Sequence, residues 1–206
     1  MRSDRIDIIA LYVLLALAIA GLVLASVAAA RTEIRPPLVR IPPPPDFDLQ
    51  VSSDGTEIQF EGRVDFGLTA AMRELVAQHP TIKRMTLESR GGVISEARGA
   101  VTVLRAHGIA THVEAHCASA CALIFAGGAT RTLAPEAQLG LHGYSLAQDR
   151  HFGMIDPVAE MQRDLAIYRA SGLENRFVAK LAELPQNPMW YPTRAELQAA
   201  GFVTHP

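Results

Sequence analysis

Two side chains of this sequence, those of Ser119 and His142, are of the types that nucleophilic catalysis combines. Ser119 lies in a predicted turn, residues 116–119, and precedes residues 120–126, whose small apolar side chains are typical of a buried helix. His142 follows a short apolar strand predicted for residues 138–141. A serine becomes an effective nucleophile when a base such as histidine takes its proton, whereas a serine at this place alone could simply cap the helix.

The segment Arg90-Gly91-Gly92 is a glycine turn between a predicted strand and a predicted helix. At such a turn the first N–H groups of the helix have no partner within it and can bind a developing negative charge. Glycine brings these groups close to a ligand because it has no Cβ atom. A Gly-Gly pair alone is more often a plain turn, so it supports an oxyanion site only in combination with the other motifs.

The elements that must position these residues alternate between strand and helix along the chain. Strands are predicted for residues 57–60, 85–88, 109–114, 130–133 and 138–141. Helices are predicted for residues 68–78, 95–106, 120–126, 156–170, 174–184 and 193–200, with Ser95 as the N-cap of the second. This alternation predicts a layered α/β fold. About 160 residues take part, which is the size of one ordinary domain.

Taken in order, the motifs resemble the proteolytic subunit of the Clp protease. The resemblance is carried by Ser-Arg-Gly-Gly-Val-Ile (residues 89–94), Ala-Ser-Ala (118–120), Leu-Ala-Pro (133–135) and Leu-His-Gly (141–143). It extends from about Glu57 to Val203 and includes residues 195–197 and 201–203, which are similar to the final helix and strand of that family. The resemblance implies a Clp/crotonase-like α/β spiral of ββα units.

The same resemblance implies a serine hydrolase, most of all a peptidase that acts on peptides or unfolded segments without a cofactor. Ser119 would be the nucleophile and His142 the general base. The backbone N–H groups of Gly92 and Ala120 would form the oxyanion hole, and Gly91 would allow the turn. In that family a proline usually precedes the glycine pair, where this chain has Arg90.

The acid of a catalytic triad is missing at its usual place, because the family's aspartate position falls at Met189. Asp156 or Asn187 could substitute as the third member, or the site could act as a Ser-His dyad. Loss of the acid from a true triad costs about 10⁴ in rate. The alternative function is therefore a catalytically inactive binding or scaffold protein that keeps the fold.

The N-terminal part of the chain predicts export. Residues 8–30 carry no charge and follow Arg2 and Arg5, so they are expected to form a transmembrane signal anchor that leaves residues 1–7 in the cytoplasm. The rival reading is a signal peptide cleaved before Arg31. Residues 31–46 would be a proline-rich stalk, or less readily a ligand for a partner domain. Residues 47–206 would form the domain outside the cytoplasm, in the periplasm.

Charge and expected location argue against two classes of partner. A formal net charge of −2 with scattered charged residues argues against nucleic acid. Crotonase-type acyl-thioester chemistry is disfavoured because coenzyme A belongs to the cytoplasm. The resemblance implies a peptide or protein substrate. The membrane would be contacted through the N-terminal helix, and a homo-oligomer is left open.

The remaining cluster of reactive residues consists of His112, His116, Cys117 and Cys121, whose spacing matches no common zinc pattern. No metal site is predicted. Cys117 and Cys121 could pair as a disulfide in an oxidising compartment. Two separate buried thiols are slightly favoured, because cysteines four apart on a regular helix have nearly parallel Cβ vectors.

Overall fold

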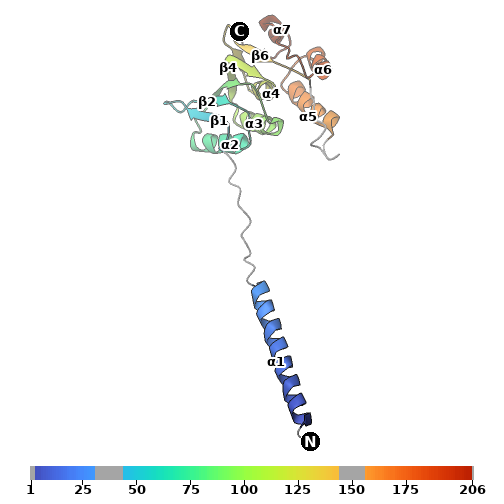
Figure 1. Cartoon of the computed structure of the whole chain (residues 1–206). Coiled ribbons are helices and arrows are strands. Elements are labelled where there is room, and N and C mark those ends of the chain that lie inside the picture. The colour runs from blue at the N-terminus through green and yellow to red at the C-terminus, as the bar shows by residue number, and fades with distance from the viewer. Residues whose placement is uncertain (1–2, 31–43, 144–155, 206) are drawn as a thin grey trace. The chain divides into compact units, whose positions relative to one another are not determined.

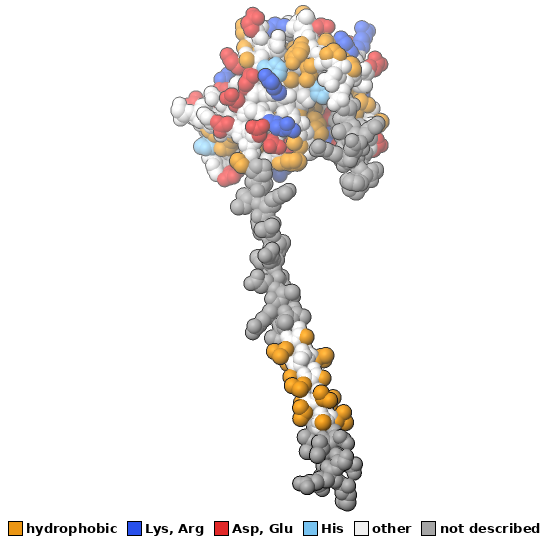
Figure 2. Space-filling view, in the orientation of Figure 1, with side chains coloured by type: hydrophobic (Ala, Val, Ile, Leu, Met, Phe, Trp, Pro, Cys, Tyr) orange, Lys and Arg blue, Asp and Glu red, His pale blue; other side chains and the backbone are white. Residues whose placement is uncertain are grey.

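The computed structural model describes residues 3–30, 44–143 and 156–205, and the chain divides into two units, Met1–Pro43 and Pro44–Pro206. The first unit contains one helix, α1 (Ser3–Ala30), shown in blue in Figure 1. Large apolar side chains on its described part are exposed, from Val13 at 52% to Leu22 at 76%, and they appear as the orange atoms of this helix in Figure 2.

Within the described part of the chain, no helix combines the length and the apolar character needed to cross a membrane. The transmembrane helix expected over residues 8–30 is therefore not supported by this finding. The proline-rich stalk expected for residues 31–46 lies mostly outside the described residues, which resume at Pro44.

The second unit is built on one mixed sheet of six strands. These are β1 (Phe47–Val51), β2 (Glu57–Gly62), β3 (Arg84–Ser89), β4 (Ala110–Ala118), β5 (Arg131–Leu133) and β6 (Gln138–Gly140). β1 pairs antiparallel with β2, and the other pairs are parallel. β4 is the longest strand, and it pairs with β5 near its start and with β6 at its end. The end of β4 is therefore held between β3 and β6.

The helices of this unit lie below the strands and to their right in the view of Figure 1. They are α2 (Leu68–Gln78), α3 (Ile94–His107), α4 (Ala120–Ala126), α5 (Pro157–Ala170), α6 (Asn175–Glu183) and α7 (Arg194–Ala199). All seven residues of α4 are buried, since it packs against β3 and β4 on one side and contacts α3 and α5. Its small apolar sequence suits this central place, where longer side chains would force its neighbours apart.

An aromatic cluster fixes the C-terminal helices against α4. Phe202 is fully buried and stacks on Phe125 of α4, with ring centroids 5.9 Å apart. The rings of Tyr168 of α5 and Phe177 of α6 also pack on the Phe202 ring, with centroid distances of 5.6 and 5.7 Å. Such pairs contribute about 0.5–1.5 kcal/mol each beyond their buried area. Because the cluster joins three helices, it sets the position of α5 and α6 beside the sheet.

The α/β class predicted from the sequence is confirmed, and the helices expected at residues 68–78 and 120–126 have those bounds. Three local expectations are wrong. β4 runs on to Ala118, where a turn was expected from residue 116, because a register shift in its pairing with β3 accommodates the extra residues. Ser95 does not cap α3, whose N-cap is Val93.

The third difference concerns residues 201–203, which turn back instead of forming a strand. The N–H groups of Phe202 and Val203 both donate to the carbonyl oxygen of Leu197, at 2.8 and 3.2 Å, so they close the end of α7. Strand β1, in contrast, has no counterpart among the predicted elements.

Candidate active site

Ser119 is the single residue between the end of β4 and the start of α4. Its backbone has φ 57° and ψ −124°, and a positive φ is unusual for a residue with a side chain. Its N–H donates to the carbonyl oxygen of Gly140 at 2.9 Å, which ties the turn to β6. A sharp strand-to-helix turn of this kind presents a serine hydroxyl at the edge of a sheet. Ser119 is the N-cap residue of α4, but its side chain makes no capping bond, so its hydroxyl does not serve as a cap.

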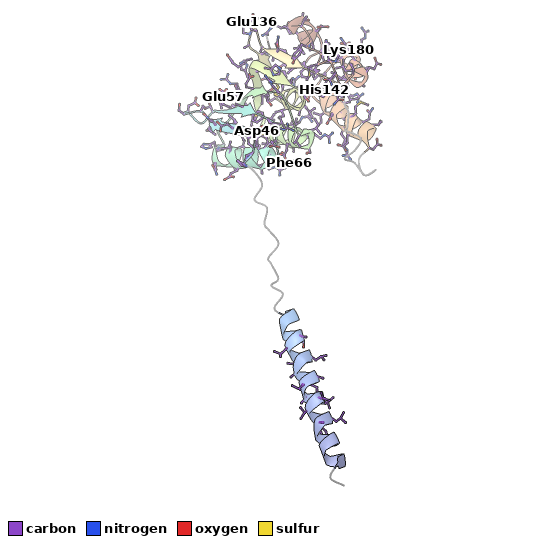
Figure 3. The ribbon with its side chains drawn as sticks, viewed as in Figure 1. Asp46, Glu57, Phe66, Glu136, His142 and Lys180 are labelled. Carbon is purple, nitrogen blue, oxygen red and sulfur yellow. A yellow bond between two sulfur atoms is a disulfide. The ribbon has the colours of Figure 1, made fainter. Side chains whose placement is uncertain are left out.

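His142 lies just beyond the end of β6 and is labelled in Figure 3. The preceding residue, Leu141, exchanges two backbone hydrogen bonds with Trp190, of 2.8 and 2.7 Å, which fix the chain at this point. The Nε2 atom of His142 is 2.7 Å from the Oγ atom of Ser119. This distance lies within the range of about 2.6–3.2 Å required for proton transfer between a nucleophile and its base. The structure thus brings together the two residues singled out from the sequence.

The other ring nitrogen of His142, Nδ1, is 2.7 Å from the carbonyl oxygen of Gly143. A carbonyl oxygen only accepts hydrogen bonds, so Nδ1 carries the proton in the neutral ring. Nε2 then has a free lone pair directed at the Ser119 hydroxyl. The backbone carbonyl of Gly143 therefore occupies the place that a carboxylate has in a catalytic triad.

Neither candidate for the third member of the triad bonds to His142 in the described parts of the chain. Asp156 is the N-cap of α5, where its Oδ1 atom accepts from the N–H groups of Val158 and Ala159 at 2.9 and 3.3 Å. Asn187 is exposed. Met189, at the position of the family's aspartate, packs on Gly140, with its Cγ atom 3.1 Å from where a Cβ of that glycine would lie.

The glycine turn packs directly on the turn that carries Ser119. Gly91 has φ 94°, and a Cβ atom there would lie 2.6 Å from the Ala118 carbonyl oxygen and 2.7 Å from the Ser119 Cβ. Only glycine permits this approach. The N–H of Gly91 donates to the Ser89 hydroxyl at 3.1 Å. The N–H groups of Gly92 and Ala120 bond to no acceptor among the described residues, which leaves both free for a ligand.

A cavity of about 290 Å³ opens at these groups. Its catalytic side is formed by Ser119, His142, Gly92, Ala120 and Gly143. The rest of its wall comes from the following residues of α3 to α6 and of the segment before His142: Ile94, Leu123, Leu141, Met161, Asp164, Leu165, Tyr168 and Leu181. The cavity is therefore mostly apolar, with convergent polar groups at one end, as is typical of small-molecule and side-chain binding sites.

A charged network includes Asp164, which belongs to the α5 wall of this cavity. Arg98 of α3 donates from Nε to the Oδ1 atom of Asp164 at 2.6 Å and also pairs with the carboxylate of Glu160. Burial raises the pKa of Asp164 even though Arg98 opposes this shift. Burial likewise raises the pKa of Tyr168. The bond to Arg98 lowers the pKa of Glu160. The network joins α3 to α5 and so fixes one wall of the cavity.

A disulfide joins Cys117 to Cys121, so the expectation of two separate thiols is wrong. Cys117 belongs to β4 and Cys121 to α4, with the turn at Ser119 between them, and their Cα atoms are 5.3 Å apart. They are not on one regular helix, so the argument from parallel Cβ vectors does not apply. Both cysteines are fully buried.

The two histidines of the same cluster have other partners. His112 contacts the hydroxyl of Thr132 at 2.7 Å and the carboxylate of Glu114 at 3.1 Å. His116 lies 3.3 Å from the hydroxyl of Tyr191. In the described ranges, no three side chains of His, Cys, Asp or Glu are grouped as metal ligands would be.

Sequence reasoning missed two groups of this site. The Gly143 carbonyl is a backbone group, so its role cannot be predicted from the type of the residue. The Arg98–Asp164 pair joins residues that are far apart in the sequence, although an aspartate on the apolar face of a predicted helix signals a buried partner.

No family model matches the sequence, and no curated protein matches it. Among solved structures the chain is similar to a point mutant of ClpP1 from Listeria monocytogenes, with a TM-score of 0.58 and 14% sequence identity. The match covers 73% of this chain and 90% of that chain. At this identity the likeness establishes the fold and nothing more. The chain has a Clp protease-like fold.

Proposed function

We propose that this chain is a serine hydrolase, and most specifically a peptidase, that acts through Ser119 and His142. The observation that carries the proposal is the hydrogen-bonded chain from the Ser119 hydroxyl through the His142 ring to the Gly143 carbonyl, with two distances of 2.7 Å. A strained turn presents the serine, and a cavity opens beside it. Strain of this kind is concentrated at functional sites.

The reaction would proceed by acyl transfer. His142 Nε2 accepts the proton of Ser119 as the Oγ atom attacks the substrate carbonyl carbon. The carbonyl oxygen becomes negatively charged and is held by the N–H groups of Gly92 and Ala120. His142 then gives its proton to the leaving amine, and the C–N bond breaks. A water molecule, activated by the same histidine, hydrolyses the acyl-enzyme and restores Ser119.

Peptides or unfolded segments are the proposed substrates. The cavity is large enough for one side chain, and its wall is formed mainly by leucine, isoleucine and methionine side chains. An apolar side chain next to the scissile bond would bury its surface there, at roughly 25 cal/mol per Å². A folded protein would have to expose such a side chain together with an extended backbone, so loosely structured chains are favoured.

The same proposal places the domain outside the cytoplasm, attached to a membrane by the N-terminal helix. Exposed apolar side chains of α1, such as Leu14 and Leu24 at 65% and 70%, support a lipid contact, because soluble proteins rarely leave large apolar patches exposed. The Cys117–Cys121 disulfide supports an oxidising compartment. The sequence left a homo-oligomer open, the Clp protease-like fold is compatible with one, and light scattering on the purified chain tests it.

One observation favours the second candidate, a catalytically inactive binding protein. The proton on Nδ1 of His142 faces a neutral carbonyl oxygen instead of a carboxylate. A carbonyl stabilises the imidazolium ion less than a carboxylate does, so the site is expected to be slower than a full triad. An inactive protein would keep the cavity and bind peptides without cleaving them.

A turnover assay on the purified full chain distinguishes the two functions. The wild type and the Ser119→Ala variant are incubated with a mixture of unstructured peptides, and mass spectrometry follows the products. The hydrolase proposal predicts cleavage by the wild type and none by the variant, with equal thermal stability of the two. Equal cleavage by both proteins would assign the activity to something other than Ser119. Binding of peptides without cleavage by either protein would establish the inactive alternative.

A further inference from the structure

We infer that the Cys117–Cys121 disulfide positions Ser119, so that the nucleophile is competent only while the two sulfur atoms are bonded. The inference rests on the proposed role of Ser119. It concerns the three residues that the disulfide spans, Ala118 to Ala120, of which Ser119 is the central one. The cysteines are thus positioning residues, since they act on the reaction through the serine.

Each end of the disulfide is fixed in a different element. Cys117 is paired in the sheet with Ser89 of β3 and Leu139 of β6. Cys121 is the second residue of α4, in the first turn of that helix. The sulfur–sulfur bond therefore fastens the end of the sheet to the start of the helix across the turn that presents the serine hydroxyl.

The backbone of Ser119 needs such a restraint. At φ 57° a residue with a Cβ atom is strained by about 1–3 kcal/mol, and it keeps that conformation only where its surroundings impose it. The noncovalent restraints are the 2.9 Å hydrogen bonds from Ser119 N–H to Gly140 and from Ala122 N–H to the Ser119 carbonyl, with Gly91 packed against the turn. Without the disulfide, the serine can relax towards negative φ. Its Oγ atom then leaves the 2.7 Å contact with His142.

The short loop closed by the disulfide also indicates that its main effect is on the position of Ser119 and not on the stability of the fold. A disulfide that closes a very short loop removes little conformational freedom from the unfolded chain compared with one that closes a long loop. Both cysteines keep their buried packing when reduced, because a buried thiol behaves as a small apolar group. Opening this disulfide should therefore affect the reactivity of Ser119 much more than the melting temperature.

Reduction by dithiothreitol is the chemical means of testing the inference. Its two thiols supply two electrons and two protons, the bond between the two cysteine sulfurs breaks to give two thiols, and the reagent closes to a cyclic disulfide. Because the disulfide is buried, complete reduction is verified by alkylation and mass spectrometry before any rate is measured.

The experiment measures the second-order rate constant for labelling of Ser119 by a fluorophosphonate in the full chain. Three forms are compared: oxidised wild type, verified reduced wild type, and the Cys117→Ala/Cys121→Ala variant. We expect the second and third forms to be labelled on the order of 10²-fold more slowly, as small displacements of a reacting group can cause, with melting temperatures lowered by only a few degrees. Reoxidation of the reduced wild type should restore its rate.

Labelling of all folded forms within two-fold of one another would overturn the inference and leave the proposed function intact. If the double variant does not fold, the comparison of oxidised with reduced wild type still decides the question. A rate loss that follows the melting temperature, so that it disappears when all forms are compared equally far below their melting points, would also overturn it. Absence of labelling in every form, including the oxidised one, would contradict the proposed function itself.

Discussion

At the scale of single residues, the site depends on a backbone carbonyl where serine hydrolases commonly have a side-chain carboxylate. That carbonyl belongs to Gly143, whose position is fixed because its N–H donates to the Pro185 carbonyl oxygen at 2.8 Å. A Cβ atom on Gly143 would lie 1.7 Å from the Leu184 carbonyl oxygen. An alanine at position 143 must therefore displace the backbone from Leu184. The carbonyl oxygen that contacts His142 would move with it.

Gly143→Ala should accordingly slow fluorophosphonate labelling of Ser119 by roughly 10²-fold, the effect expected of a displacement of about 1 Å. The matched control is Gly108→Ala, at the C-cap of α3. A Cβ atom there meets nothing within 4 Å, although φ is 62°. The control should lose about 1 kcal/mol of stability and keep the labelling rate. If Gly143→Ala folds and is labelled at the wild-type rate, the Gly143 carbonyl does not orient the histidine.

The two side chains considered as a third triad member should be dispensable. Asp156→Asn keeps an N-cap residue of nearly equal quality and removes the carboxylate, so stability should change by only a few tenths of a kcal/mol. Asn187 is exposed, and Asn187→Ala should be equally mild. Peptide turnover by both variants should stay within about two-fold of the wild type. A loss of ten-fold or more in either variant would show that the named side chain reaches His142 during the reaction.

At the scale of elements, the ion pair between Arg98 of α3 and Asp164 of α5 holds the cavity wall. Its contribution to stability can be tested by mutation and by changing the pH. Arg98→Ala leaves Asp164 buried without its cation, which costs about 3–5 kcal/mol in such pairs. Arg163→Ala is the matched control, because Arg163 also pairs with Glu160 but is 67% exposed, and it should cost at most about 1 kcal/mol.

The pH dependence of the Arg98→Ala deficit has a definite sign. Burial already raises the pKa of Asp164, and loss of the opposing arginine raises this pKa further. In the variant the folded protein then keeps a proton that the unfolded chain releases near its ordinary pKa of about 3.9. The stability lost by the variant should be smallest below that pH and should grow as the pH rises. Chemical denaturation of both proteins across the acidic range measures this difference, and a deficit independent of pH would contradict the buried pair.

The elements show which parts of the fold a sequence can predict. The bounds of α2 and α4 follow from apolar spacing and from the glycine and proline residues beyond them, which are local signals. β1 was not predictable in the same way, because its five residues gain their stability from pairing with β2. The extension of β4 beyond residue 114 depends on a bulge against β3, and the positive φ of Ser119 depends on contacts with Gly91 and Gly140. Such features arise from tertiary contacts.

At the scale of the whole molecule, the proposed N-terminal anchor can be tested through the orientation of the chain. If residues 8–30 cross a membrane, as proposed, the arginines before them would keep the N-terminus inside and the domain would face outward. Protease added to intact spheroplasts should therefore digest the domain while a cytoplasmic control protein survives. Protection of the domain would contradict the proposed location. If the segment is a signal peptide, N-terminal sequencing of the mature protein should begin at or near Arg31.

The measurement that tests the account most directly is covalent modification of Ser119 in the purified full chain by a fluorophosphonate, located by mass spectrometry of the peptide that contains it. The account predicts an adduct on Ser119 in the wild type and none in Ser119→Ala. It also predicts labelling slower by orders of magnitude in His142→Ala, because serine and histidine act as one unit. A folded, oxidised wild type that forms no adduct at Ser119, or a His142→Ala variant labelled as fast as the wild type, would contradict it.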